Sequence, residues 1–313
     1  MGSMKTKLKK MFPGLLEEYR HLGRVRIIRQ VNKRKKLKKS EYPDIISRQY
    51  KDRIGHELDW ENPTAYTEKM QWSKLYDENP LKTQYTDKYL VREWVKDTIG
   101  EEYLIPLLGV WDSVDDIQFE KLPNSFVLKT NHGSGTNIIV KDKTKLNYKM
   151  AKQAISDWMK IDFGYKSFEL HYSKIKPKII AEKYIETKND DLQDYKFLCF
   201  DGVPHFCWVD IGRYSVHKRS VYDMDWVLQP WNQETLGSYE KEIPKPKNFE
   251  KMVEIAKTLS AGFSHVRVDL YNVDGQIYFG EMTFTNGGGF DRIIPAEYDY
   301  ELGKLWKIDT TQA

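Results

Sequence analysis

Two acidic side chains stand where an antiparallel hairpin would bring them together. Asp269 and Glu281 flank the turn signal Asp274-Gly275 in the stretch HVRVDLYNVDGQIYFGEMTF. Pairing about that turn places Asp269 opposite a position near Glu281. Two such carboxylates need a cation between them, and Mg²⁺ requires few protein carboxylates when phosphate oxygens complete its shell. The alternative, a surface hairpin with a cross-strand salt bridge, is less favoured because the surrounding apolar residues indicate a half-buried sheet.

Two cationic side chains lie in comparable apolar surroundings. Arg267 precedes Asp269 by two residues and therefore shares its face of the strand. There it could neutralise a phosphate or a developing charge. Lys196 lies inside the apolar run DYKFLCF, where a lysine is costly without an anion. Both are candidates for contact with phosphate or with a substrate carboxylate.

A glycine-containing loop joins two apolar runs in FVLKTNHGSGTNIIV. Lys129 ends the first run, and the turn Gly133-Ser134-Gly135-Thr136 follows it. Glycines let backbone N–H groups approach phosphate closely, and the two hydroxyls add donors. Neither a Walker pattern nor a G-x-G-x-x-G after a strand is present. Taken alone, the stretch favours a plain hairpin, since glycine turns between strands are common.

A further acid lies where a strand-like run ends. In EKYIE, Glu186 follows the run Ile179–Tyr184, so its carboxylate could hold ribose hydroxyls while neighbouring backbone groups read adenine. Exposed acids at strand ends are common, so this motif is weak evidence by itself.

Periodicity and turn signals predict the elements that carry these residues. We expect helices over 5–40 with a break at Pro13-Gly14, over 64–75 with Thr64 as its cap, from Thr86 to before Gly100, and over 148–162 and 248–262 with Gly262 as a left-handed cap. We expect strands at Tyr103–Ile105, Phe126–Lys129, Ile138–Val140, Ile179–Tyr184, Tyr195–Phe200, His205–Ile211, Val221–Asp225, Trp226–Leu228, Val266–Asn272 and Gln276–Met282. No regular βαβ rhythm is present, so the expected class is α+β with antiparallel sheets.

Composition narrows the class of protein further. The chain has 313 residues, enough for two modest domains or one of several lobes, and 40% are hydrophobic. No apolar run approaches the roughly 20 residues of a membrane-spanning helix, and no secretory leader is evident, so we expect a cytoplasmic protein. Met1–Met4 resemble vector-derived residues. Cys199 and Cys207 lack metal-ligand spacing and are expected to be buried and reduced.

Charge is distributed unevenly. Residues 1–40 carry a net charge of +12 although the whole chain carries +4, which leaves −8 for the remainder. Such an arm could lie on an anionic membrane at the inner face of the cell membrane, at roughly 1 kcal/mol per basic residue. It could equally be a solvated helix that packs through Leu15, Leu16, Ile27 and Ile28. Nucleic acid is less favoured, because no interleaved aromatic platform accompanies the basic tract.

Six blocks occur in the order found in TupA-like ATP-grasp proteins: TDKYLVREWV, IGEEYLIPLLGVWDS, LPNSFVLKTNHGSG, IIAEKYIE, DYKFLCFDG and VRVDLYNVDGQIYFGEMTF. The resemblance covers roughly residues 45–305. It implies an ATP-grasp fold, in which two α/β lobes with antiparallel sheets clasp the nucleotide, here with a basic helical N-terminal arm. The implied divisions are an arm (1–45), a helical and linker lobe (46–110), a central lobe with the glycine loop (111–187) and a C-terminal lobe with a metal site (188–313).

The resemblance also implies roles for individual residues. For the nucleotide, it implies phosphate contacts from Lys88, Lys129 and the loop Gly133, Ser134, Gly135 and Thr136, an adenine edge at Glu182, Tyr184 and Ile185, and a ribose contact at Glu186. For catalysis it implies clamps at Lys196 and Arg267, and Mg²⁺ ligands at Asp269 and Glu281. Many ATP-grasp enzymes have Asn two residues after the metal-binding Glu, where this chain has Thr283, with Asn286 nearby. The third metal ligand is therefore either of these two residues.

The implied activity is ATP-dependent ligation of a carboxylate and an amine through an acylphosphate, in bacterial surface-polysaccharide (capsule) biosynthesis. We expect a uronic-acid glycan or its precursor and an amino acid or amine as co-substrates. The substrate-side candidates, each equally interpretable as a mobile-loop or solvated basic residue, are Arg213, His217, Arg219, Gly288 and Arg292. Alternatives are a sugar kinase, a carbohydrate-binding module, and a sugar-nucleotide glycosyltransferase using Asp223-Met224-Asp225.

Overall fold

The computed structural model describes residues 13–187, 192–212, 217–239 and 241–310, with side chains from residue 17 onward. The chain divides into two compact units, which are described separately. Unit 1 comprises the described parts of Met1–Lys38 together with Pro106–Lys166 and Tyr172–Tyr184. Unit 2 comprises Lys39–Ile105, Ser167–His171 and the described parts of Ile185–Ala313.

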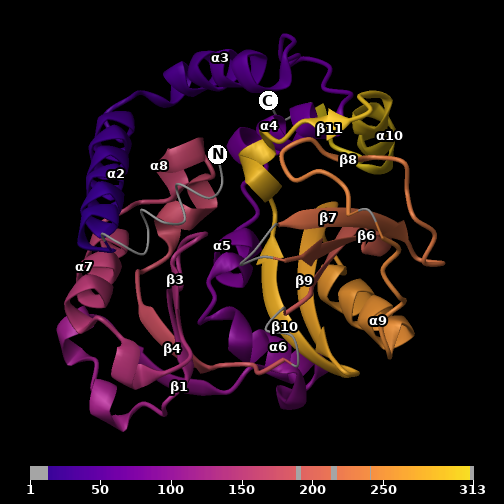
Figure 1. Ribbon diagram of the computed structural model, residues 1–313. Helices are drawn as coiled ribbons and strands as arrows, with labels where there is room; N and C mark the ends of the chain where they lie inside the picture. Colours follow the sequence, from indigo (N-terminus) through magenta and orange to yellow (C-terminus); the bar gives the residue numbers. More distant parts are fainter. Residues whose placement is uncertain (1–12, 188–191, 213–216, 240, 311–313) are drawn as a thin grey trace. The chain divides into compact units, whose positions relative to one another are not determined.

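Unit 1 is built on an antiparallel sheet of order β1-β4-β2-β3, of which β1, β3 and β4 are labelled in Figure 1. Its core joins the sheet to helix α7, because the buried side chains of Phe126, Leu128, Ala181 and Ile155 form one apolar cluster. The strands are β1 (Leu107–Trp111), β2 (Phe126–Thr130), β3 (Asn137–Val140) and β4 (Ile179–Lys183), and α7 spans Tyr148–Met159. The short helix α8 (Gly164–Ser167) stands where the chain passes from unit 1 to unit 2.

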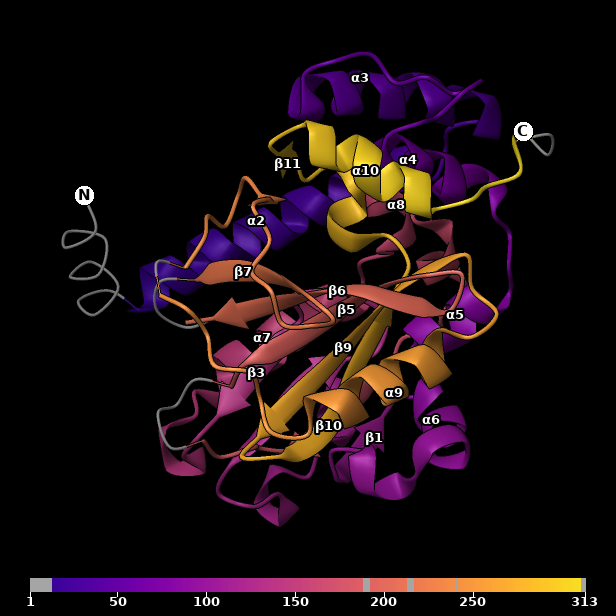
Figure 2. The ribbon, with the colours of Figure 1, turned by 90° about the vertical axis from the view of Figure 1, so that its right-hand side faces the viewer.

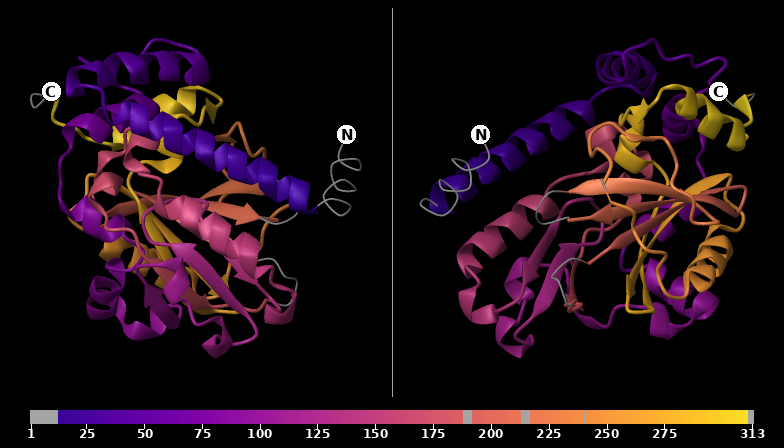
Figure 3. Two further views of the ribbon diagram at one scale, coloured as in Figure 1. Left: turned by 90° about the vertical axis from the view of Figure 1, so that its left-hand side faces the viewer. Right: turned by 45° about the vertical axis from the view of Figure 1, so that its right-hand side comes forward.

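Helix α2 (Pro13–Arg34) runs beside α7, as both views in Figure 3 show. Val31 packs with Ile161 and Phe163, and the half-buried Ile27 and Ile28 lie against that cluster. The expected packing of the basic arm on the protein body through Ile27 and Ile28 is confirmed. The side chains of Leu15 and Leu16 lie outside the described part of the chain.

Unit 2 contains a five-stranded antiparallel sheet of order β10-β9-β5-β6-β7. Figure 2 shows helix α9 lying across one face of it. There Phe197, Cys199, Ala256 and Leu259 belong to one buried cluster. The elements are β5 (Asp194–Phe200), β6 (Val203–Ile211), β7 (Lys218–Asp223), β9 (His265–Val273), β10 (Gln276–Thr283) and α9 (Phe249–Ser260), with a two-stranded ribbon of β8 (Asn232–Gln233) and β11 (Ile293–Ile294).

The remaining helices of unit 2 are α3 (Tyr42–Ile54), α4 (Tyr66–Tyr76), α5 (Leu81–Thr86), α6 (Val91–Ile99) and α10 (Glu297–Leu305). Helix α4 is tied to α10 by the buried carboxylate of Asp299, which accepts from the backbone N–H and the hydroxyl of Thr67 at 3.0 and 2.6 Å. Tyr66, Leu302 and Trp306 fill the apolar contact beside it.

The predicted α+β class with antiparallel sheets is confirmed, as are both long hairpins, β5–β6 and β9–β10. Cys199 and Cys207 are free, buried thiols, as expected. In the described residues no helix is long and apolar enough to cross a bilayer.

Several predicted boundaries are wrong. Tyr103–Ile105 is not a strand, since Glu101–Tyr103 form a 3-10 turn and β1 starts at Leu107. No helix starts at Thr86, because the Asp87 carboxylate accepts from the Tyr89 and Leu90 N–H groups and forms a turn between α5 and α6. Thr64 does not cap α4, whose N-cap is Ala65. Instead Glu68 accepts from the N–H groups of both residues.

Other elements were missed or displaced. Helices α3 and α10 were not predicted, although α3 carries a Pro in its first turn and ends at Gly55 in the left-handed conformation. Trp226–Leu228 forms only an isolated bridge from Leu228 to Tyr222.

The glycine predicted at the end of helix α9 has the expected backbone conformation, since Gly262 has a positive φ of 83°.

Candidate active site

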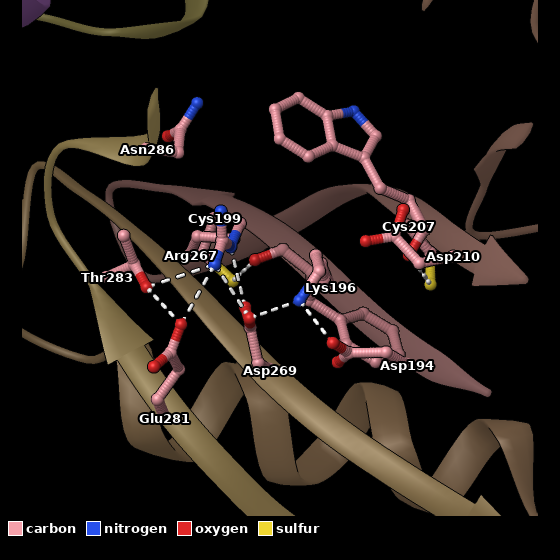
Figure 4. Close-up of polar contacts among 12 residues, drawn as sticks. Asp194, Lys196, Cys199, Cys207, Asp210, Arg267, Asp269, Glu281, Thr283 and Asn286 are labelled. Atoms are coloured by element: carbon pink, nitrogen blue, oxygen red, sulfur yellow. Dashed lines mark hydrogen bonds and ion pairs between the residues drawn. The ribbon is translucent and has the colours of Figure 1, made fainter. Parts of the chain in front are cut away.

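A row of charged residues crosses the sheet of unit 2. Glu281 on β10 lies opposite Asp269 on β9, and Asp269 lies opposite Lys196 on β5. Alternate strand residues share a face, so Arg267 and Asp194 stand on the same side as this row. Figure 4 shows these side chains converging. The opposite face of the sheet carries the apolar cluster beneath α9.

A β-bulge is what places Glu281 in this row. Ile277 and Phe279 of β10 belong to the apolar cluster beneath α9, and regular alternation would direct residue 281 there as well. The register shifts between Phe279 and Glu281, so Gly280 is the extra residue. A Cβ on Gly280 would lie 3.0 Å from the carbonyl oxygen of Asp269, a contact tighter than most side chains make. Glycine at 280 therefore permits the close backbone approach at this bulge.

The Arg267 guanidinium joins the two carboxylates. Its Nε and Nη2 atoms donate to Asp269 Oδ1 and Oδ2 at 2.6 and 2.7 Å, and Nη2 also lies 3.3 Å from Glu281 Oε1. Nη2 donates to Thr283 Oγ1 at 3.1 Å, and that hydroxyl donates to Glu281 at 3.3 Å. The two acids thus share one cation, which offsets their mutual repulsion.

Two lysines complete the charge balance. Lys196 Nζ donates to Asp194 Oδ2 and Asp269 Oδ2, each at 2.6 Å, with all three side chains buried. Lys88, in the turn between α5 and α6, lies 3.1 Å from Glu281 Oε2. Three carboxylates and three cations therefore meet on one sheet face, and their formal charges balance.

The two predicted metal-binding acids have different environments. Burial disfavours the charge of Glu281, yet Lys88, Arg267 and Lys196 together hold its pKa well below the ordinary value. Burial raises the pKa of Asp269, and the charges of Arg267 and Lys196 oppose that shift. The Glu281 side chain is 29% exposed, whereas that of Asp269 is 3% exposed. Glu281 is thus the more accessible of the two acids to an incoming cation.

The donor atoms of Asp269, Glu281 and Thr283 are hard carboxylate and hydroxyl oxygens, the kind that Mg²⁺ prefers. Within the described residues no group of three or more His, Cys, Asp or Glu side chains is arranged to hold a metal. Asn286 is buried, and its amide contacts the hydroxyl of Tyr66 at 2.8 Å. Thr283 contacts Glu281 directly, so of the two alternatives for a third ligand it is the one in contact with the acid pair.

Tyr66 links Asn286 to a buried histidine. His265 Nδ1 lies 2.9 Å from the carbonyl oxygen of Cys199 and must therefore carry a proton, while burial lowers the pKa of His265 to about 3. The neutral ring then accepts at Nε2 from the Tyr66 hydroxyl, 3.0 Å away. In the structure the Tyr66 hydroxyl donates to Asn286 Oδ1 at 2.8 Å, so its one proton is shared between Asn286 and His265 Nε2.

In unit 1, the predicted nucleotide lysine Lys129 forms an ion pair with Glu182, with Nζ to Oε2 at 2.6 Å. Both residues project from the sheet face opposite α7, because their strand neighbours Leu128 and Ala181 belong to the α7 cluster. Glu182 is buried, so it needs this cation. The sequence did not reveal the pair, because 53 positions separate its members.

Hydrogen bonds hold both ends of the glycine loop. Thr130 donates from its N–H to the Thr136 carbonyl at 3.1 Å and from its hydroxyl to the Thr136 hydroxyl at 2.8 Å. Asn131 is fixed by bonds to the backbone of Lys178 and Lys176. Gly133 is buried, and a Cβ there would lie 2.5 Å from the Phe163 ring. The exposed tip is therefore only Ser134 and Gly135.

The predicted adenine and ribose residues follow β4. Tyr184 is half-buried, and Lys141 Nζ lies 5.8 Å from its ring centroid. Ile185 is half-buried and Glu186 is exposed, where the chain enters unit 2. Their contacts with a nucleotide stay a prediction.

The substrate-side candidates fall into two groups. His217 and Arg219 meet at Asp210, which accepts from Arg219 Nε and Nη2 at 2.6 and 2.8 Å and lies 3.4 Å from His217. Arg219 also donates to Gln233 and lies over the Trp208 ring. Burial opposes the charge of Asp210, but Arg219 holds its pKa well below the ordinary value.

The second group is separate. The Gly288 carbonyl accepts from Lys74 Nζ at 2.8 Å and from Gln71 Nε2 at 3.2 Å, in a turn where residues 287–289 all have positive φ. Arg292 pairs with Glu234 at 3.3 Å, and both side chains are exposed. Arg213 lies outside the described residues. Sequence reasoning missed Asp194 and Asp210, although the i, i+2 spacing of Asp194 and Lys196 was a usable signal.

Comparison with known proteins supplies the family. Residues 68–307 match the family described as TupA-like ATPgrasp. This protein belongs to the TupA-like ATP-grasp family, and the ATP-grasp fold expected from the six sequence blocks is confirmed. No curated protein matches the sequence significantly.

Solved structures show distant similarity. D-alanine–D-alanine ligase from Bacillus anthracis complexed with ATP has 18% identity and a TM-score of 0.36, over 64% of this chain and 54% of that one. The ATP-grasp ligase PsnB with a phosphomimetic precursor variant, Mg and ADP has 10% identity and a TM-score of 0.40, over 73% and 61%. Phosphoribosylamine–glycine ligase from Thermotoga maritima has 12% identity and a TM-score of 0.37, over 64% and 48%. This chain thus spans about half to three fifths of the length of those structures.

Proposed function

We propose that this protein is an ATP-dependent ligase that joins a carboxylate to an amine through an acylphosphate. The observation that carries the proposal is the charge-balanced cluster of Asp269, Glu281, Arg267, Lys196 and Lys88, in a chain of the ATP-grasp family. Phosphoryl transfer requires positioning and charge stabilisation more than a nucleophilic side chain, and this cluster offers both.

The reaction proceeds in two balanced steps. A carboxylate oxygen of the first substrate attacks the γ-phosphorus of ATP, and ADP leaves with the bridging oxygen. The amine nitrogen then attacks the acyl carbon, phosphate leaves with the former carboxylate oxygen, and the nitrogen loses a proton. The products are an amide, ADP and phosphate.

Each residue of the cluster has a proposed task in these steps. Asp269 and Glu281, with Thr283, would hold Mg²⁺, which when bound offsets the charge of the phosphate oxygens. Arg267 and Lys196 neutralise charge on the transferred phosphoryl group, and Lys88 contacts the nucleotide phosphates. The roles of Thr283 and Asn286 as alternatives for the third metal ligand stay part of this proposal.

Unit 1 is proposed to contribute nucleotide contacts. Lys129 would bind phosphate, and the exposed Ser134-Gly135 tip would present backbone N–H groups to it. Glu182, Tyr184 and Ile185 would form the adenine edge. Glu186 would bind the ribose hydroxyls.

The proposed co-substrates are a uronic acid of a surface glycan or its precursor and an amino acid or amine. Arg219 is an unsuitable direct clamp in this arrangement, because both edges of its guanidinium are engaged by Asp210 and Gln233. His217 contacts the same carboxylate from a half-buried position and is the more accessible candidate. The proposed setting is cytoplasmic polysaccharide biosynthesis, such as capsule formation.

The structure weakens the glycosyltransferase alternative. The Asp223 carboxylate accepts from the N–H groups of Asp225 and Val227 at 3.0 and 2.8 Å. The D-x-D letters therefore form an Asp-stabilised turn at the end of β7, which explains them without a sugar nucleotide.

The test is a screen of amino acids and uronic-acid glycans for a MgATP-dependent gain in mass. A ligase requires both co-substrates for full ADP release, whereas a sugar kinase releases ADP without any amine. Stronger thermal stabilisation by a UDP-sugar than by MgATP would contradict the proposal.

A further inference from the structure

Helix α2 uses only one of its faces for packing. On the inner face, the Arg24 Nε atom donates to Asp157 at 2.7 Å, and Arg34 donates to the backbone carbonyls of Tyr165 and Lys166. Lys35, just beyond the helix, pairs with Asp162 at 2.8 Å. Arg24, Arg34 and Lys35 therefore have structural roles within unit 1. The other basic residues of the arm are not explained by these contacts.

The outer face of α2 carries a second, regular set of residues. The outer stripe consists of positions spaced by three and four, all exposed: Tyr19, Leu22, Arg26, Arg29 and Lys33, continued past the helix end by Lys36. This spacing places them along one side of the helix, over about 21 Å from the first to the fifth. Tyr19 is 76% exposed and Leu22 is 61% exposed. Apolar side chains occupy one end of the stripe and cations the other.

No carboxylate forms an ion pair with the cations of this stripe in the described part of the chain. The only acids of α2 are Glu17 and Glu18, and Glu17 pairs with Arg24 at 2.6 Å and Arg20 at 3.5 Å. Arg26, Arg29 and Lys33 form no ion pair with the residues that the structure describes. The sequence before the helix adds four lysines, at positions 5, 7, 9 and 10.

We propose that α2 binds the surface of an anionic lipid bilayer through its outer stripe. Lipid phosphates would pair with the four cations, while Tyr19 and Leu22 would enter the interface between headgroups and acyl chains. A nucleic acid would match the cations alone and would leave the exposed leucine unexplained. The net charge of −8 on residues 41–313 favours an approach in which the arm, rather than the body, meets the membrane.

This inference is independent of the proposed ligase activity, because no residue of the outer stripe belongs to the charged cluster. Removal of the whole arm is an unsuitable test, since it would expose the apolar contact of Val31 with Ile161 and Phe163. Substitutions confined to the stripe leave that contact intact.

The experiment is co-sedimentation of the full chain with vesicles of phosphatidylcholine alone or mixed equally with phosphatidylglycerol, at physiological salt. Binding is expected only to the anionic vesicles. The variant Arg26→Gln/Arg29→Gln/Lys33→Gln/Lys36→Gln is expected to reduce partitioning by about a hundredfold or more. The variant Tyr19→Ser/Leu22→Ser is expected to reduce it by about tenfold. Both variants should keep the wild-type thermal midpoint.

The matched control removes the same charge elsewhere, in the variant Lys121→Gln/Lys149→Gln/Lys160→Gln/Lys257→Gln, whose four lysines are all exposed. Its partitioning should stay within about threefold of wild type. An equal loss in this control would overturn the proposal, since only net charge would then matter. Wild-type binding by the Tyr19→Ser/Leu22→Ser variant, or tighter binding to duplex RNA than to the anionic vesicles at the same salt concentration, would also overturn it.

Discussion

Asp269 and Glu281 lie directly opposite each other on β9 and β10, and the guanidinium of Arg267 donates to both carboxylates. The pair is therefore neutralised by a cation of the protein itself in this structure. Arg267 makes one 3.3 Å contact with Glu281 and two short contacts with Asp269, and Lys88 lies 3.1 Å from Glu281. An incoming divalent cation would therefore displace these longer contacts to Glu281 more easily than the short ones to Asp269. Glu281 is thus the acid through which metal dependence is best tested.

Glu281→Gln keeps the size of the side chain and removes its charge. We expect turnover at saturating MgATP to fall by at least about a hundredfold, because the proposed Mg²⁺ site loses a carboxylate ligand. The fold should persist, since this side chain is partly exposed. ADP release and the thermal midpoint measure the two effects. Glu301→Gln on α10, which breaks an exposed pair with Lys304, is the control. Turnover equal to that of this control would refute the assignment.

Arg267→Met should destabilise the protein by about 3–5 kcal/mol, because it removes one of the two cations, Arg267 and Lys196, that pair with the buried Asp269 in the described residues. Adding Asp269→Asn should recover part of that loss, since the uncompensated charge is removed. Urea denaturation of the two single variants and the double variant gives the coupling free energy. Strictly additive effects would show that the ion pair does not control the stability of the sheet.

Lys129→Met should weaken ATP binding by more than about tenfold and also destabilise unit 1, because buried Glu182 loses its cation. The double variant with Glu182→Gln should regain stability but not ATP affinity, which separates the two roles. Calorimetric titration and the thermal midpoint measure them. Lys178→Met, which breaks the pair with exposed Asp112, is the control in the same unit. Recovery of ATP affinity in the double variant would assign Lys129 a purely structural role.

His265 makes the stability of the protein depend on pH. Its pKa is about 3 in the folded protein because of burial, whereas an unfolded chain binds the proton near pH 6.5. Between these values the unfolded state holds one more proton, so the free energy of unfolding rises with pH and falls as pH drops below about 6.5. His265→Gln should remove about 1.4 kcal/mol per pH unit from that slope near pH 5.

Urea denaturation at a series of pH values measures that slope. Above about pH 7.5 both proteins should have the same slope, because the histidine is neutral in both states there. Identical slopes near pH 5 would mean that His265 is protonated in the folded protein. The neutral hydrogen-bond chain from Cys199 to Tyr66 would then be wrong.

Much of the candidate site could be predicted from the sequence, because its signals are local. The turn at Asp274-Gly275 indicated the hairpin, and the hairpin indicated the opposition of Asp269 and Glu281. The bulge at Gly280 could not be predicted, since regular alternation would have directed Glu281 into the apolar cluster. Only the partner strand determines which residue is extra.

Other features depend on contacts between distant parts of the chain. The pairing of Lys129 with Glu182 follows from the sheet order β4-β2, which no local pattern encodes. Helix α3 was not predicted, although Ile46, Tyr50 and Ile54 form a buried stripe along it. Arg24 is buried on α2 because its partner Asp157 lies on α7. Composition alone cannot separate such buried ion pairs from solvated charges.

The transfer of oxygen from the carboxylate substrate to phosphate tests the acylphosphate mechanism most directly. The carboxylate that the screen identifies would be labelled with ¹⁸O in both oxygens and turned over with MgATP and its amine. We predict one labelled oxygen in each phosphate released and one retained in the amide, as the two balanced steps require. Unlabelled phosphate, or ADP formed without release of phosphate, would contradict the account.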